Sequence, residues 1–421
     1  VVGDEAGTAI TTGDRNTAVG FAALDASSTA ADNTAVGYNA LTATTTGQRL
    51  VAVGSAALDG NTTGDDNTAV GYNSLGANTT GAGCIAIGSY ALDANTTGGN
   101  IAIGRNALGS NTTGTLNTAL GYDALFTNVD GDNSTAVGYQ ALYSQEPASN
   151  VDMYNVMVGH TAGYGLTTGI RNVGVGASVL QGAVTGNDNT AMGHAALAAN
   201  TSGGEQTAVG SLALDANTTG TENTAFGFSA LTSNTTGNSN TALGRKALFT
   251  NTTGTGNIAV GQGALLANTT ASHNTAVGYD ALVANTTGTL NVAVGYNASD
   301  TCTIGRYNTA LGAYALTTDI DGDYSVAIGY KALEAQESDS ANQAVYNTAV
   351  GVLAGNALTT GTNNTFVGSY AGGVGTITGN NNTTLGWHAG QAITGGYNNT
   401  LIGSDAGITG SPCGNITTGG N

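Results

Sequence analysis

Basic residues and proline are scarce in this sequence of 421 residues. It contains eight lysines and arginines and two prolines, against 67 glycines. A collagen helix is excluded, because it needs far more proline and a strict Gly-X-Y triplet. The 27 acidic residues leave a net charge of −19. A polyanionic surface repels nucleic acid and anionic membranes, so we expect neither as a partner.

Charged residues of either sign are also rare, and so are long apolar runs. Only 8% of the residues are charged, whereas about a quarter is usual in globular domains. No run approaches the roughly 18 apolar residues of a membrane helix, so membrane insertion is not expected. Since 40% of the residues are hydrophobic and regularly spaced, the chain can bury a core. The composition therefore favours a repeat architecture over a globular enzyme.

Cysteine is limited to Cys84, Cys302 and Cys413. They are odd in number and hold different positions in the repeat, so they form no disulfide framework. The simplest interpretation is that they are free, small apolar residues. The alternative is a bridge between chains.

A nine-residue motif recurs along the chain. NTAVGYNAL begins at Asn33, with near-copies from Asn16, Asn67 and Asn274. Its glycine returns mostly every 17 residues, 24 times in all. Such a unit is too short for two helices, and its apolar residues alternate by two, which is the period of a strand. A fixed short period is typical of solenoids, so we predict an all-β parallel β-solenoid of about 24 coils, continuous over residues 1–421.

Two inserts interrupt the period, near residues 145–154 and 336–346. They separate sub-blocks 1–142, 143–333 and 334–421. Their flanks are similar, since NVDGDNSTAVGYQAL from Asn128 corresponds to DIDGDYSVAIGYKAL from Asp319, 191 residues later. This indicates a higher-order tandem block, with each insert projecting as a loop. We expect specificity to lie in these loops.

The strand of each coil carries apolar residues on both faces. The apolar residue before the glycine and the threonine two positions earlier are predicted to point into the coil. The alanine between them would then face outward, where a small side chain lets another backbone approach. We therefore predict an oligomer interface in this column, at Ala18, Ala35, Ala69, Ala276, Phe366 and Leu401.

Leucine and asparagine occupy further regular columns. Leucine four residues after the glycine is expected inside the coil. Asparagine four residues before the glycine is expected to form a ladder that satisfies buried amides. The Asn and Gly of the recurring NTTG are predicted to supply the positive φ of a tight turn.

Oxygen-bearing side chains alternate around a glycine at the start of both insert regions. This spacing resembles the beginning of a calcium loop, without its distal glutamate, and the alternative is a solvated Asp-Gly turn. The candidate calcium ligands are Asn128, Asp130 and Asp132, and Asp319, Asp321 and Asp323. Calcium is the one cofactor that the sequence suggests. The histidines form no other metal site, because His160 and His194 share a column but lie two coils apart, roughly 9.6 Å.

Aromatic residues frequently follow the repeat glycine. This column is variable, so we expect it to be exposed, as an adhesive or glycan-contacting face; the alternative is that neighbouring rings only stack on one another. The candidate interaction face comprises Tyr38, Tyr72, Tyr122, Tyr139, Tyr279, Tyr296, Tyr330 and Trp387.

Three motifs carry a family resemblance: NIAIGRNAL at Asn100, NIAVGQGAL at Asn257 and SVAIGYKAL at Ser325. They resemble the NSVAIG repeats of trimeric autotransporter adhesin heads, whose coil is shorter. The longer NTAVGYNAL-NTTG form is similar to repeats of phage-type tail fibres and bacterial surface proteins. The resemblance implies a left-handed β-roll, a homotrimer and an extracellular position on a cell or virion surface. It bears on architecture more than on a receptor. The partners that we expect are further copies of the chain and a host-surface or glycan receptor.

These observations predict a non-enzymatic extracellular structural protein, a rod-like surface fibre or adhesin segment. No catalytic residues are expected, because no Ser-His-Asp arrangement or other catalytic context occurs. One alternative is the subunit of a filament stacked end to end, since the terminal coils show no polar cap. A minor alternative is an ice- or mineral-binding solenoid, which the placement of the paired threonines in turns disfavours.

Overall fold

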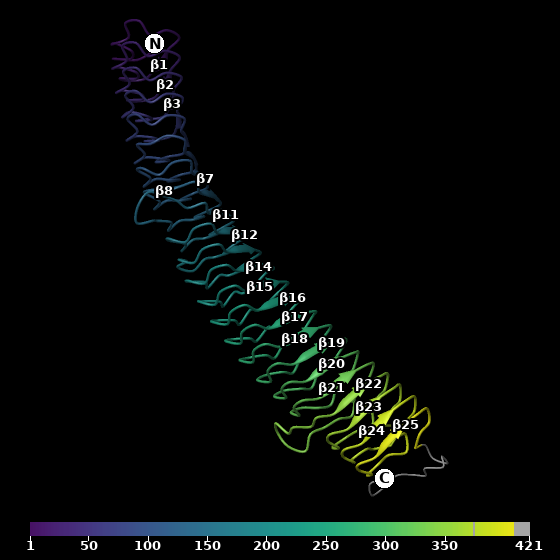
Figure 1. Ribbon diagram of the computed structural model, residues 1–421. Helices are drawn as coiled ribbons and strands as arrows, with labels where there is room; N and C mark the ends of the chain where they lie inside the picture. The colour runs from purple at the N-terminus through teal and green to yellow at the C-terminus, as the bar shows by residue number, and fades with distance from the viewer. Residues whose placement is uncertain (374, 408–421) are drawn as a thin grey trace. The chain divides into compact units, whose positions relative to one another are not determined.

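The computed structural model describes residues 1–373 and 375–407. Over these residues the chain is an all-β parallel β-solenoid without a helix, which confirms the predicted fold class (Figure 1). Its main strands number 23, one for each of about 23 turns of roughly 17 residues. At the N-terminal end the expected first strand is an isolated bridge between Val2 and Val19. The chain forms two compact units, Val1–Gln206 and Thr207–Asn421.

The first unit contains eleven strands of the main type and two short ones, β8 (Gly131–Asp132) and β10 (Val151–Asp152). The main strands are β1 (Thr17–Val19), β2 (Thr34–Val36), β3 (Val51–Val53), β4 (Thr68–Val70), β5 (Ile85–Ile87), β6 (Ile101–Ile103), β7 (Thr118–Leu120), β9 (Thr135–Val137), β11 (Val156–Val158), β12 (Val173–Val175) and β13 (Thr190–Met192).

The second unit contains twelve strands of the same kind. They are β14 (Thr207–Val209), β15 (Thr224–Phe226), β16 (Thr241–Leu243), β17 (Ile258–Val260), β18 (Thr275–Val277), β19 (Val292–Val294), β20 (Thr309–Leu311), β21 (Val326–Ile328), β22 (Thr348–Val350), β23 (Thr365–Val367), β24 (Thr383–Leu385) and β25 (Thr400–Ile402).

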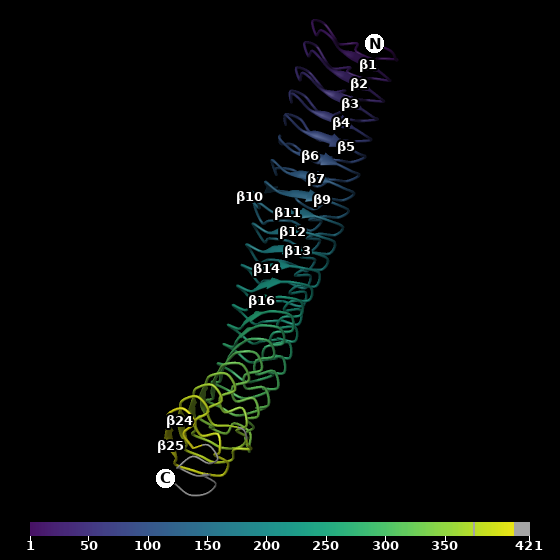
Figure 2. The ribbon, with the colours of Figure 1, turned by 90° about the vertical axis from the view of Figure 1, so that its right-hand side faces the viewer.

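Within each unit, the main strands pair in parallel with the same three residues of the next turn (Figure 2). Thr17, Ala18 and Val19 lie opposite Thr34, Ala35 and Val36. The backbone bonds repeat at every turn; the Thr17 N–H, for example, donates to the Asn33 carbonyl at 2.8 Å. The repeat glycine that follows has a φ near +140°. A Cβ at Gly37 would lie 2.3 Å from the Gly54 carbonyl oxygen, so this position excludes every other residue.

The orientation predicted for the strand is wrong. The central alanine is buried in the coil, and the flanking threonine and apolar residue point outward. The side chains predicted to form an oligomer interface lie in the core of a single chain: Ala18, Ala35, Ala69, Ala276, Phe366 and Leu401. The physical reason is the narrow interior. The leucine column and a second alanine column, at Leu41 and Ala40 for example, are also fully buried, and they leave only enough room for a methyl group beneath the strand.

In three of the turns that lack the leucine, a larger apolar residue occupies the central strand position, whereas the turns with Ser299 and Gly355 keep alanine there. Met157, Phe366 and Leu401 replace the alanine in three turns, and these same turns carry Gly163, Gly372 and Gly407 in place of leucine. A Cβ at Gly372 would lie 2.4 Å from a ring carbon of Phe366. In these turns the larger central residue fills the space that the leucine would occupy, so the interior stays closely packed.

The positive φ values also lie elsewhere than predicted. The Asn and Gly of NTTG do not adopt positive φ, whereas the core leucine does, at +56° for Leu41. The turn glycine is required for space, because a Cβ at Gly64 would lie 2.3 Å from the Gly81 carbonyl oxygen. The asparagine of the same turn has a different role, described below.

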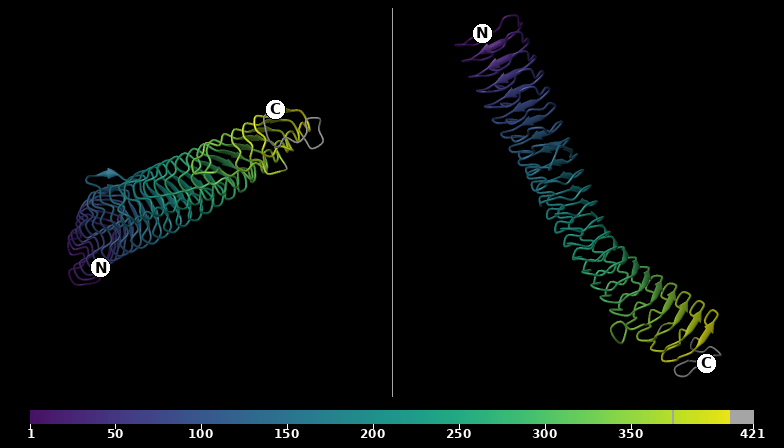
Figure 3. Two further views of the ribbon diagram at one scale, coloured as in Figure 1. Left: turned by 90° about the horizontal axis from the view of Figure 1, so that it is seen from below. Right: turned by 60° about the vertical axis from the view of Figure 1, so that its left-hand side comes forward.

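The two inserts lie at equivalent places, between β9 and β11 and between β21 and β22. In the first, β10 pairs in parallel with β8. In the second, an isolated bridge joins Asp323 and Ala344. Both inserts project from the stacked turns of their own unit as loops (Figure 3).

Candidate functional site: the outward strand face

The outward side of the main strands is uncharged in both units. We call the first and third residues of the 23 main strands the strand face. The first residue is always Thr, Val or Ile, and the third is always Val, Ile, Leu, Met or Phe. Many of the third residues are strongly exposed, including Phe226 at 58% and Met192 at 45%. An apolar column of this length is unusual on a chain with a net charge of −19.

The residues after the repeat glycine flank the strand face and form the candidate aromatic face. From Phe21 to Ser404 this column contains no acidic residue. The predicted aromatic residues are exposed by between 39% and 56%: Tyr38, Tyr72, Tyr122, Tyr139, Tyr279, Tyr296, Tyr330 and Trp387. Several also stack, with ring centroids 5.5 Å apart for Tyr122 and Tyr139 and 5.4 Å for Tyr279 and Tyr296. Stacking within a column and exposure at the surface therefore occur together.

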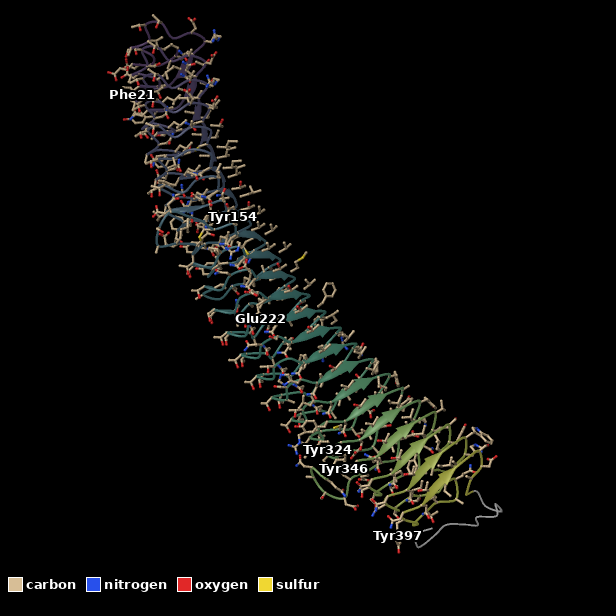
Figure 4. All side chains as sticks on the ribbon, viewed as in Figure 1. Phe21, Tyr154, Glu222, Tyr324, Tyr346 and Tyr397 are labelled. Atoms are coloured by element: carbon tan, nitrogen blue, oxygen red, sulfur yellow. The ribbon has the colours of Figure 1, made fainter. Side chains whose placement is uncertain are left out.

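A second aromatic ladder was missed at the sequence level. Tyr307, Tyr324 and Tyr346 precede the corner asparagine or serine, and their ring centroids are 4.9 and 5.1 Å apart. Tyr324 and Tyr346 lie next to one another at the surface (Figure 4). The 17-residue step from Tyr307 to Tyr324 was a usable signal, but the insert displaces Tyr346 from the period.

In the first unit, the same column holds alternating charges. Arg15 pairs with Asp32, Arg49 with Asp66, and Arg171 with Asp188, each pair one turn apart. The neighbouring Arg171 guanidinium lowers the pKa of the Asp188 carboxyl. These residues stand two positions before the main strands. Because the pairs are exposed, they contribute little to stability. They do place charge at one border of the strand face.

Buried asparagines form the predicted ladder and also a second one. In the first ladder, Asn33 Nδ2 donates to the Gly47 carbonyl at 2.9 Å, and its Oδ1 accepts from the N–H of Leu50 in the next turn at 2.9 Å. The second ladder consists of the NTTG asparagines; Asn78 Nδ2, for example, donates to Asn61 Oδ1 at 3.3 Å. The corner amides are therefore satisfied inside the coil, as a buried polar group requires.

The first set of candidate calcium ligands is directed to separate partners. Asn128 belongs to the second asparagine ladder and is fully buried. Asp130 accepts from the Thr113 hydroxyl. Asp132 accepts from the Thr115 hydroxyl at 3.0 Å. Their side-chain oxygens accept hydrogen bonds from neighbouring turns and are not directed toward a common metal position.

The second set repeats this dispersion. Asp319 is buried at the ladder position and accepts from Gln336 Nε2 at 2.6 Å. Asp321 accepts from the Ser338 hydroxyl. Asp323 pairs with Arg306 at 3.1 Å. Within residues 1–373 and 375–407, no three histidine, cysteine, aspartate or glutamate side chains are gathered as a metal would need.

Two cysteines are buried and unpaired, while Cys413 lies outside the described residues. Cys84 and Cys302 are free thiols. Burial raises the pKa of both, to about 12 for Cys302, where the nearby Asp319 carboxyl adds to the effect. A buried thiol with a raised pKa is unreactive.

No helix in the described part of the chain is long and apolar enough to cross a bilayer. No model of a known protein family matches the chain, and none of the curated proteins compared with it is similar to it.

Proposed function

We propose that the protein is a non-enzymatic structural repeat protein that self-associates through its strand face. The observation that supports this most strongly is the absence of charge from every first and third strand residue, on a chain with a net charge of −19. Two such polyanions repel one another through most of their surfaces. The strand face lets two copies approach while apolar side chains leave water.

The size of the strand face is consistent with this role. With strands about 4.8 Å apart and about 3.3 Å per residue, the eleven main strands of the first unit present roughly 500 Å². Two copies would bury roughly 1,000 Å² through that unit alone, which is close to the lower limit of stable interfaces. The twelve strands of the second unit and the aromatic border add to this area.

The assembly we propose is a homo-oligomeric extracellular fibre or adhesin segment, in line with the resemblance to trimeric adhesin heads. The proposed interface is therefore the first and third residues of each main strand, in place of the central alanine that the sequence predicted. The oligomer expected from the resemblance is a trimer. The end-to-end filament remains the alternative assembly, and it would not cover the strand face.

Sedimentation velocity of the purified chain tests the proposal. We expect a homo-oligomer, and we expect Val260→Glu together with Val294→Glu to reduce it to the monomer while the circular dichroism spectrum is unchanged. Thr253→Glu, on an exposed NTTG turn, is the matched control and should leave the oligomer intact. A wild-type chain that stays monomeric at about 100 μM, a concentration far above typical interface affinities, would refute self-association.

One observation favours a second candidate, the ice-binding solenoid. Threonines lie on the flat outer side of the strands as well as in the turns, for example at Thr207, Thr224 and Thr241. The paired threonines of NTTG do lie in turns, which disfavours this function, but the strands add a column of single outward threonines. A regular array of hydroxyl and methyl groups about 4.8 Å apart can order water. Inhibition of ice recrystallisation by the wild type and its loss in Thr224→Glu would support this candidate, whereas inactivity of the wild type would exclude it.

A further inference from the structure

Gly109 interrupts a column of side chains in the first unit. The same position holds Asp93 one turn earlier and Phe126, Tyr143 and Tyr164 in the following turns. The three rings stack, with centroids 5.5 Å and 5.1 Å apart. A Cβ at Gly109 would lie 3.2 Å from a ring carbon of Phe126. The aromatic stack therefore ends above a position that has no side chain.

A cavity of about 330 Å³ opens at this position. Tyr143 covers one face of Phe126, and the other face borders the cavity beside Gly109. Tyr90 provides a second aromatic wall, and it is 37% exposed. The volume lies at the lower end of the range for small-molecule sites, about 300–1,000 Å³.

The remaining walls of the cavity are polar and carry one charge of each sign. Asp93 is half-buried, and its Oδ1 accepts from Asn73 Nδ2. Arg105 donates to the Tyr122 hydroxyl at 3.2 Å, and within the described ranges no carboxylate lies at ion-pair distance from it. Asn106 and Ser110 complete the wall. The cavity thus offers hydrogen-bond donors and acceptors without a net charge.

We propose that this cavity binds one pyranose ring of a neutral saccharide, in the place of the missing side chain at Gly109. A pyranose has a C–H face that can pack on the free face of Phe126 and hydroxyl groups that can donate to Asp93 and accept from Arg105. Phe126 and Asp93 are two turns apart, about 9.6 Å, so a single ring at the level of Gly109 fits between them.

Two other classes of ligand fit the cavity less well. A flat aromatic ligand would cover Phe126 and remove water from Asp93 and Arg105 without offering either a hydrogen bond beyond those to Asn73 and Tyr122, which weakens binding. A simple anion or cation would be attracted by one of these two residues and repelled by the other. The proposal is independent of self-association, because the cavity lies among the turns of a single chain.

Titration calorimetry of the full chain with glucose, galactose, mannose and N-acetylglucosamine tests the site, with phenol as the aromatic probe. We expect at least one sugar to bind with a dissociation constant of roughly 1 mM. Gly109→Phe would fill the cavity and reduce this affinity by about tenfold or more, a loss of the size expected when a site is blocked. Gly109 does not have a positive φ, but its Cβ would lie 3.2 Å from the Asn106 carbonyl oxygen and from a ring carbon of Phe126. The variant therefore requires a shift of a few tenths of an ångström in these neighbours, and an unchanged circular dichroism spectrum checks that it folds.

The matched control is Thr42→Phe, which places the same ring in the same column four turns before Gly109. We expect it to keep full affinity, and we expect Arg105→Gln to weaken binding without changing the oligomer. The proposal is overturned if no sugar binds, if sugar binding survives Gly109→Phe, or if phenol alone binds at the cavity.

Discussion

The two copies of the long block differ at several buried positions, and the central one is Asn128 in the first unit against Asp319 in the second. In the first copy, Asn128 donates to Asn111 and to the Gly131 carbonyl, and accepts from Gln145 at 2.9 Å. In the second copy, Asp319 has no proton to donate when ionised; it accepts from the Gly322 N–H and from Gln336. The same coil therefore contains either a neutral ladder or a buried acid.

The residues around Asp319 also differ from those around Asn128. Cys302 replaces the ladder asparagine one turn earlier. Because the thiol does not reach it, Asn285 Oδ1 is buried without a hydrogen-bond partner in the described structure. Burial raises the pKa of the Asp319 carboxyl, and the hydrogen bond from Gln336 opposes this effect. The comparison teaches that the second copy depends more on its glutamine than the first copy does.

Removing the glutamine should have the largest effect. We expect Gln336→Ala to lower local stability by about 3 kcal/mol or more at pH 7, because the buried carboxylate of Asp319 loses a hydrogen-bond donor and the cost is larger for a charged group than for a neutral one. Gln145→Ala should cost less, about 1–3 kcal/mol, because the groups that lose a partner, on Asn128, Ser134 and Asn155, are all neutral. Amide hydrogen exchange of the adjacent strands measures both. Equal losses in the two copies would contradict the difference.

Converting the first copy into the second should be nearly as costly. In Asn128→Asp, a carboxylate would face the oxygens of Asn111 and Gly131 that now accept from the amide. We expect a loss of about 2–4 kcal/mol at pH 7, since a buried charge is harder to accommodate than a neutral polar group. The loss should shrink as the pH falls and the carboxyl becomes protonated. Hydrogen exchange at pH 5 and pH 7 would show this, and a pH-independent loss would argue against a buried carboxylate.

The reverse change should stabilise the second copy. Because the folded pKa of Asp319 is raised, the folded state holds more protons than the unfolded state between the two pKa values. Its stability is therefore highest below the unfolded pKa, about 3.9, and falls as the pH rises toward the folded pKa. We expect Asp319→Asn to gain about 1–2 kcal/mol at pH 7 and to remove this pH dependence. A variant that is less stable than the wild type at pH 7 would contradict it.

Restoring the neighbouring asparagine should have the smallest effect, and only in combination. In Cys302→Asn, the new amide can donate to Asn285 Oδ1, but its own oxygen would face the Asp319 carboxylate. We therefore expect little change alone and a favourable coupling of about 1 kcal/mol with Asp319→Asn, the size of one satisfied hydrogen bond. A double-mutant cycle measures this coupling, and strictly additive effects would show that the ladder is not continuous here.

The period and the asparagine ladder could be predicted because glycine and asparagine recur at the same positions of the 17-residue repeat. The orientation of the strand could not be obtained in the same way, since alanine, threonine and valine give two apolar faces. The prediction left out the volume of the side chains that must fit inside the coil. The substitution of Met157, Phe366 and Leu401 in three of the turns that lack the core leucine was visible in the sequence, and it places this column inside.

The candidate surfaces were predicted less completely. The aromatic face was found because its residues follow an invariant glycine. The cavity at Gly109 depends on a missing side chain beneath Phe126, and a single glycine among 67 carries no such information. The partners of Asp319 likewise depend on which side chains meet across successive turns.

The chain's three methionines provide the most direct test of the covered strand face. Met153 and Met157 are fully buried within the coil, and Met192 lies on the strand face with 45% exposure in the single chain. Oxidation by hydrogen peroxide, followed by peptide mass spectrometry, reports the accessibility of each thioether. We predict that Met192 is as protected as Met153 and Met157 at high protein concentration and becomes the fastest to oxidise after dilution. Rapid oxidation of Met192 at every concentration would show that no second copy covers the strand face, and faster oxidation of Met157 than of Met192 would contradict the orientation of the strand itself.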